Sequence, residues 1–215
     1  MKTKASSLLS EQRTIVHRGY GLALLLILLL VNCRTDSSKQ TAAQPTVRYT
    51  CDAYGWTIQL PPGYAVENQA TSQQTLEAAK ELLTERVQID DQSVQFATLR
   101  KNDLCKIEVN SVHHATNPLL RWDDYLSGYR AFVYNNYQHL GFTVDSSSQT
   151  TLIDHLAFHE LHFTVSALEE DLTIEHHIFK RYYPQQQAEL VINMRAEGAA
   201  EVAALRAAIL ASEFE

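Results

Sequence analysis

The sequence predicts an α+β domain in which helices flank an antiparallel β-sheet. Two observations support this prediction: apolar residues alternate over several short segments, and short polar turns join most of these segments in sequence. Strands that follow one another through such turns pair antiparallel, and helices then cover the sheet. The predicted order over residues 46–215 is β-α-β-β-α-β-β-β-α.

The first half of the domain contains a strand, a helix and a pair of strands. Apolar residues alternate over 46–60, a turn or bulge is expected at 52–55 where the phase of the alternation breaks, and the Pro-Pro-Gly of 61–63 ends that strand. Residues 74–87 have apolar side chains at helical spacing. Residues 93–100 and 104–112 alternate again on either side of a short polar turn, which predicts a hairpin.

The second half begins with the longest predicted helix. Over residues 119–140 the apolar side chains gather on one side, and Gly141 is well placed to cap the C-terminus of the helix. The polar segment Ser-Ser-Ser-Gln at 146–149 is expected to be a loop. Three strands and an Ala-rich helix are then expected at 157–166, 171–183, 189–196 and 199–212.

The N-terminus has the features of an export signal. Residues 1–21 are polar and basic, and residues 22–31 form an unbroken apolar run of ten residues. A membrane-spanning helix needs roughly 18 apolar residues, so this run is too short for one. It ends in Leu-Val-Asn-Cys at 30–33, which resembles the lipobox of bacterial lipoproteins, although that family prefers a small residue where Asn32 stands. The resemblance implies cleavage before Cys33 and attachment of acyl chains to that cysteine.

Two alternatives to lipidation stay open, namely an uncleaved membrane anchor and ordinary secretion. Cleavage in ordinary secretion favours an Ala-x-Ala-like site, and the end of the apolar run lacks one. With lipidation, residues 1–32 are a signal peptide, 33–45 a flexible tether and 46–215 a single globular domain. The expected location is then the bacterial cell envelope, where the domain faces the periplasm or the cell surface. The lipid on Cys33 would hold it to a membrane.

The charge of the exported part excludes one class of partner. Without residues 1–32, the chain keeps 14 basic and 24 acidic residues, a net charge of −10. A surface this acidic repels phosphate backbones, so we expect no binding to nucleic acid.

Two segments of the domain resemble one superfamily. Residues 55–64, GWTIQLPPGY, resemble the opening of PsbP-like and DcrB-like domains, in which a strand is followed by proline, glycine and an aromatic residue. The ending ILASEF at 209–214 is similar to the Ser-Phe ending that often follows the last helix in this superfamily. The resemblance covers 46–215 and implies an antiparallel sheet between helices. Its members are mostly non-enzymatic binding or assembly factors, which implies a protein partner in the envelope.

Two cysteines remain after Cys33 is assigned to lipid. Cys51 and Cys105 each lie in a predicted strand of the same sheet, and an even pair in an oxidising compartment favours a disulfide. Such a bridge would close a loop of about 54 residues. The alternative is two buried free thiols, if the geometry forbids pairing.

Four histidines of the predicted sheet are candidate metal ligands, namely His159, His162, His176 and His177. His155, His159 and His162 have helix-like spacing, but on a strand His159 and His162 point to opposite faces. His162 and His176 could still meet across a hairpin. A periplasmic ligand- or metal-binding protein is therefore the alternative function, while histidines without a metal are the simpler interpretation and no cofactor is predicted.

Catalytic motifs are missing from the sequence. The chain has no Gly-x-Ser-x-Gly and no Gly-rich phosphate loop, and Asp123 and Asp124 fit the first turn of the long helix, where negative charge is favourable. Tyr125 and Tyr129 share one face of this helix and are expected to pack on the sheet with their hydroxyls at its rim. An exposed aromatic patch for a protein partner is the alternative. The sequence thus predicts a non-enzymatic envelope protein.

Overall fold

The computed structural model describes residues 46–67, 93–114, 121–167 and 172–215. The predicted signal peptide, Cys33, the tether and the predicted helix at 74–87 lie outside these ranges. None of the helices within them is long and apolar enough to cross a membrane.

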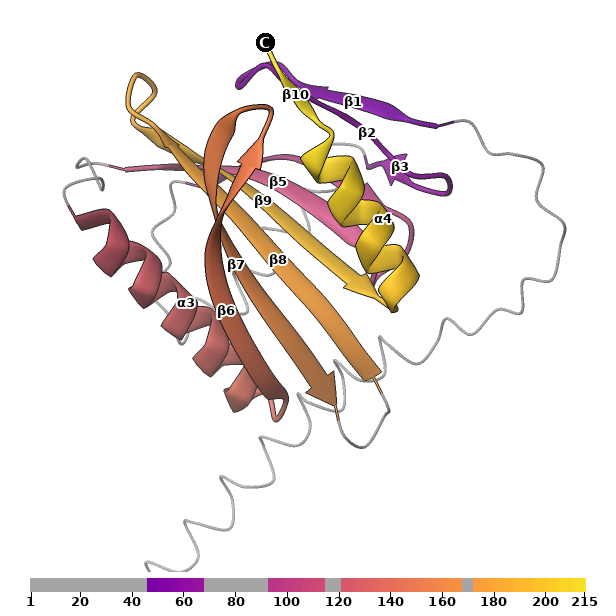
Figure 1. The fold of residues 1–215 in the computed structure, drawn as a ribbon, viewed down its shortest axis with the longest axis vertical. Helices are drawn as coiled ribbons and strands as arrows, with labels where there is room; N and C mark the ends of the chain where they lie inside the picture. The colour runs from indigo at the N-terminus through magenta and orange to yellow at the C-terminus, as the bar shows by residue number, and fades with distance from the viewer. Residues whose placement is uncertain (1–45, 68–92, 115–120, 168–171) are drawn as a thin grey trace, which may run out of the picture. The chain divides into compact units, whose positions relative to one another are not determined.

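Over the described residues, the domain consists of a seven-stranded sheet, a three-stranded sheet and two helices (Figure 1). The large sheet has the order β3-β4-β5-β9-β8-β7-β6, and the small one β1-β2-β10. The elements are β1 (Arg48–Cys51), β2 (Trp56–Gln59), β3 (Ala65–Val66), β4 (Ser93–Arg100), β5 (Lys106–His113), α3 (Trp122–His139), β6 (Thr143–Ile153), β7 (Leu156–Ala167), β8 (Leu172–Tyr183), β9 (Ala188–Glu197), α4 (Ala199–Leu210) and β10 (Glu213–Phe214).

The strand pairing is antiparallel in both sheets. The predicted α+β class, with helices beside an antiparallel sheet, is therefore confirmed. Predicted and observed bounds of the strands from β7 to β9 and of α4 agree within two residues, because these segments have the clearest apolar periodicity.

Two apolar cores lie on opposite faces of the large sheet. Leu190 and Met194 of β9 pack with Leu205 of α4 in one core, whereas Val191 of β9 and Leu161 of β7 belong to the other, beside α3. Since successive residues of a strand point to opposite faces, β9 supplies both cores from alternate positions. We call the two sides of the sheet the α4 face and the α3 face (Figure 1).

Helix α3 ends as the sequence predicts. Gly141 has a φ of 91°, and its amide donates to the carbonyl of Gln138 at 3.0 Å. The amide of Phe142 donates to the carbonyl of Tyr137 at 3.1 Å, and the two rings are in contact, with centroids 6.1 Å apart. These two bonds form a Schellman motif, which requires the left-handed conformation that glycine adopts at little cost.

The polar segment predicted as a loop is instead part of a strand. β6 includes residues 146–149 and pairs with β7 along its whole length. It is an edge strand of the large sheet and most of its side chains are exposed, so no apolar alternation marks it in the sequence. Asp154 and His155, with φ values of 45° and 65°, form the two-residue turn to β7.

The expected turn or bulge at 52–55 is a turn, and it divides the first predicted segment into two strands. These strands, β1 and β2, pair antiparallel. β10 adds the third strand, which the sequence does not indicate because two residues show no periodicity. Phe214 of β10 lies opposite Trp56, whose indole N–H donates to the Ser212 hydroxyl at 2.7 Å. The C-terminal segment thereby closes against the start of the domain.

Candidate functional site

A group of polar side chains lies on the α4 face, over β7 and β8. Glu160 and His162 occupy alternate positions of β7, and Glu175 and His177 occupy alternate positions of β8, so all four point to one face. Arg206 of α4 contacts this group from above the sheet. We call these five residues the sheet-face cluster.

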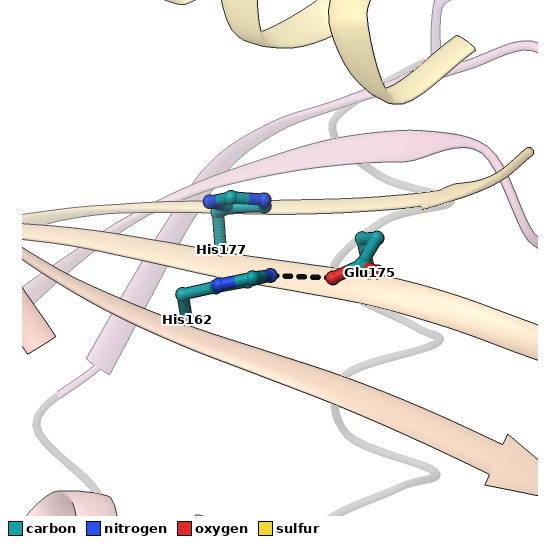
Figure 2. A group of neighbouring side chains, drawn as sticks. All are labelled: His162, Glu175 and His177. Atoms are coloured by element: carbon teal, nitrogen blue, oxygen red, sulfur yellow. Dashed lines mark hydrogen bonds and ion pairs between the residues drawn. The ribbon is translucent and has the colours of Figure 1, made fainter. Parts of the chain in front are cut away.

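The two histidines of the cluster lie directly opposite each other in the antiparallel register of β7 and β8. Figure 2 shows the ring of His177 over that of His162; their planes are 15° from parallel and their centroids 4.2 Å apart. His162 Nε2 contacts the carboxylate of Glu175, which also accepts a bond from the Thr164 hydroxyl at 3.0 Å. His177 is 7% exposed, whereas the side chains of His162 and Glu175 are 34% and 26% exposed. The cluster therefore has a buried side and a side open to solvent.

Glu160 forms the buried side of the cluster. Its carboxylate accepts bonds from His177 Nδ1 at 2.8 Å, from Arg206 Nη2 at 3.1 Å and from the Gln149 amide at 2.8 Å, and it contacts the Thr151 hydroxyl. Burial alone would raise the pKa of Glu160, but these donors hold it far below its ordinary value. Because an ionised carboxylate can only accept, His177 carries its proton on Nδ1 and leaves Nε2 free of this bond.

The other two candidate ligands lie on the α3 face. His176 is buried, its Nδ1 lies 2.9 Å from the Tyr137 hydroxyl, and burial lowers its pKa to about 3. His159 lines a cleft of about 180 Å³ together with Asp123 and Arg130 of α3. The structure therefore brings His162 and His177 together and separates His159 and His176 from them. The pairing considered for His162 with His176 is wrong, because the register places His177 opposite His162.

Sequence reasoning missed the other three members of the cluster. The signal for two of them is a period of two residues: Glu160 alternates with His162 on β7, and Glu175 with His177 on β8. Arg206 has no comparable signal, because only the packing of α4 on the sheet brings it to Glu160, 46 residues earlier in the chain.

A buried ion pair lies on the α3 face. The Lys180 ammonium is 2.8 Å from Glu189, and their side chains are 1% and 0% exposed. Tyr125 donates to Glu189 at 2.8 Å and accepts from Lys180 at 3.0 Å, while the ammonium lies 3.4 Å from the centroid of the Tyr129 ring. Burial lowers the pKa of Lys180. The two tyrosines pack on the sheet as predicted, but the Tyr125 hydroxyl binds buried charges instead of lying at the rim.

A second charged group on the α3 face joins β5 and β9. Glu108 accepts from Arg195 at 2.9 Å and from Lys106 at 2.7 Å. Burial alone would raise the pKa of Glu108, but the two cations lower it to about 2. The carboxylate is therefore ionised at neutral pH.

Replacement of Glu108 by glutamine is expected to reduce the sensitivity of the fold to acid. The folded-state pKa is about 2 and the ordinary value 4.5, so the stabilisation by Glu108 is present above pH 4.5 and is lost as the pH falls toward 2. Urea denaturation between pH 3 and pH 6 should show a shallower decline of the unfolding free energy in the variant. The exposed Asp103, replaced by asparagine, serves as the control; equal slopes for wild type and Glu108→Gln would contradict the prediction.

Cys51 and Cys105 are both buried free thiols, so the possible disulfide is not formed. Tyr54, three residues after Cys51, packs its ring 4.9 Å from that of Tyr183, which pairs with the first residue of β9. Cys105 directly precedes β5, whose first residue pairs with Arg195 near the other end of β9. A strand rises about 3.3 Å per residue, so the two ends of β9 near which Cys51 and Cys105 lie are roughly 20 Å apart. A disulfide needs Cα atoms within about 7 Å of each other. The alternative of two free thiols is the one that the structure contains.

Comparisons with known proteins concern the fold. No protein-family model matches this chain, and no curated protein sequence does so either. Among solved structures, the solution structure of cyanobacterial PsbP (CyanoP) from Synechocystis sp. PCC 6803 is similar with a TM-score of 0.49 and 9% identity, covering 85% of this chain and 99% of that one. The E65A mutant of Mog1 is similar with a TM-score of 0.39 and 11% identity, covering 76% and 84%. No functional residue is transferred from either protein.

Proposed function

We propose that this protein is a lipid-anchored, non-enzymatic binding protein of the bacterial cell envelope. The observation that carries the proposal is the short apolar run that ends in Leu-Val-Asn-Cys at 30–33. Acyl chains on Cys33 would hold the chain at a membrane, and the polar residues 33–45 would let the domain reach a protein partner there.

The state of the buried carboxylates supports binding rather than catalysis. Glu108, Glu160 and Glu189 each accept bonds from at least two donors, and the pKa of each lies below its ordinary value despite burial. A general acid or base works best with a pKa near the working pH, so these groups are poor proton carriers at neutral pH.

Replacement of Cys33 by serine is expected to release the protein from the membrane fraction, because the acyl chains can no longer be attached. Fractionation of cells would measure this, and mass spectrometry of the extracted wild type should show an acylated Cys33 as its first residue. Thermal unfolding of both proteins is the control, since residues 46–215 are unchanged. A wild-type protein that retains residues 1–32 would instead support the uncleaved anchor.

Crosslinking in intact cells tests the partner. A photo-reactive amino acid at Phe132 of α3 or Leu152 of β6, two exposed apolar positions, should give one discrete adduct at one or both sites. The same substitutions in the Cys33→Ser background should lose the adduct, because the domain is no longer held at the membrane. Only diffuse adducts, equal in both backgrounds, would count against a specific envelope partner.

A further inference from the structure

Three side chains of the sheet-face cluster have the arrangement of metal ligands. The candidate ligand atoms of His162, Glu175 and His177 all lie within 4.8 Å of one another. The two strands determine where the Cβ atoms of these residues lie. His162 and His177 are directly opposite each other, and Glu175 lies two residues from His177 on the same face. Figure 2 shows the Glu175 carboxylate at the end of the His162 ring, beneath the plane of His177.

The chemistry of these ligands selects a class of ion. Two imidazoles and one carboxylate suit Zn²⁺ and related divalent transition metals, whereas Ca²⁺ and Mg²⁺ prefer sites built from oxygen atoms. Ligand atoms around a tetrahedral Zn²⁺ are about 3.3 Å apart. His162 and Glu175 are partly exposed, so their side chains have room for the rotation that closes the site from 4.8 Å.

The groups behind the ligands support this use. Histidines that bind metals commonly donate their other ring N–H to a carboxylate, which fixes the tautomer and orients the ring. Glu160 does this for His177, since it accepts the Nδ1 proton at 2.8 Å, and Arg206 balances its charge. The Thr164 hydroxyl likewise holds Glu175 at 3.0 Å. The bond from Nδ1 to Glu160 leaves Nε2 as the nitrogen of His177 that a metal ion could use.

We propose that His162, Glu175 and His177 bind one divalent transition-metal ion of the zinc class on the α4 face. The ligands are Nε2 of both histidines and one oxygen of Glu175, and the ion replaces the present contact between His162 and Glu175. The exposed side of the cluster leaves a further position to water. Glu160 is a positioning residue, and His159 and His176 take no part because they lie on the other face. The site goes beyond the proposed anchoring and partner binding, and either can fail without the other.

The test is titration of the full mature protein, purified without a histidine tag and stripped with a chelator, with Zn²⁺ against a chromophoric competitor. We expect one equivalent bound by the wild type. His162→Gln and Glu175→Gln should lose this binding, whereas His159→Gln, a matched histidine on the other face, should keep it. Glu160→Gln should weaken binding by about 10–100-fold, an effect that a purely structural role would not produce.

Substitution with Co²⁺ gives a second readout that does not depend on affinity. Tetrahedral coordination by nitrogen and oxygen should produce visible absorption bands in the wild type and in His159→Gln, and not in the ligand variants. Circular dichroism confirms that each variant is folded. Absence of Zn²⁺ binding by the folded wild type, or equal binding by wild type and His162→Gln, would overturn the proposal.

Discussion

Replacement of Lys180 by methionine is expected to lower the free energy of unfolding by about 3–5 kcal/mol. The reason is that Lys180 and Glu189 are both almost completely buried, 2.8 Å apart. Methionine fills much of the same volume but leaves the Glu189 carboxylate without its ammonium, and an unpaired buried charge is costly. Domains are stable by only about 5–15 kcal/mol, so the variant should unfold at a temperature lower by roughly 10 °C.

The double variant Lys180→Met/Glu189→Leu separates the ion pair from the packing. Since both charges are removed, most of the lost stability should return, because apolar replacements of buried ion pairs are often neutral or stabilising. Tyr125 would then lose both of its partners, so recovery is expected to be incomplete. Urea denaturation of the wild type and of both variants measures the effect. A single variant that costs less than about 1 kcal/mol would show that Glu189 is not held as a buried charge.

Replacement of Glu160 by alanine is expected to cost about 3–5 kcal/mol, measured as the free energy of unfolding with a chelator present. Glu160 is fully buried and joins β6, β7, β8 and α4 through one carboxylate. Its loss leaves the buried His177 without an acceptor for Nδ1 and frees the Arg206 guanidinium from the sheet. Opening of the contact between α4 and the sheet should appear as faster amide exchange in α4.

The matched control for Glu160→Ala is Glu175→Ala. Both carboxylates lie on the α4 face and both contact a histidine, but Glu175 is 26% exposed. Its removal should cost no more than about 1 kcal/mol, because solvent screens the pair and can replace its bonds. Equal losses for the two variants would mean that burial does not distinguish these carboxylates.

The candidate site was predictable only in part, and the register explains why. His162 was a candidate ligand from its place in a strand, but its neighbour depends on which residue of β8 lies opposite. A shift of one residue in the register would bring His176 to that position and turn the side chains of β8 to the other face. Apolar alternation shows that β7 and β8 are strands, but it does not identify the residue opposite His162.

The two cysteines and the edge strand show the same limit. An even number of cysteines allowed a disulfide between Cys51 and Cys105, but the tertiary structure places Cys51 near one end of β9 and Cys105 near the other. β6 was missed because both its faces are largely exposed, so its strand conformation depends on backbone bonds to β7 and not on its own side chains.

The sequence by itself determined the local features of this protein. These features depend on residues that are neighbours in the sequence: the apolar alternation over β7 to β9, the helical spacing of α3 and the glycine cap at Gly141. The structure confirms each of them. The lipidation of Cys33 is also inferred from neighbouring residues, and it stays a prediction. Only the tertiary structure decided that Lys180 meets Glu189, that Arg206 reaches Glu160, and that His162 faces His177 and Glu175. These contacts depend on register and helix packing, which follow from the whole buried core rather than from any one segment.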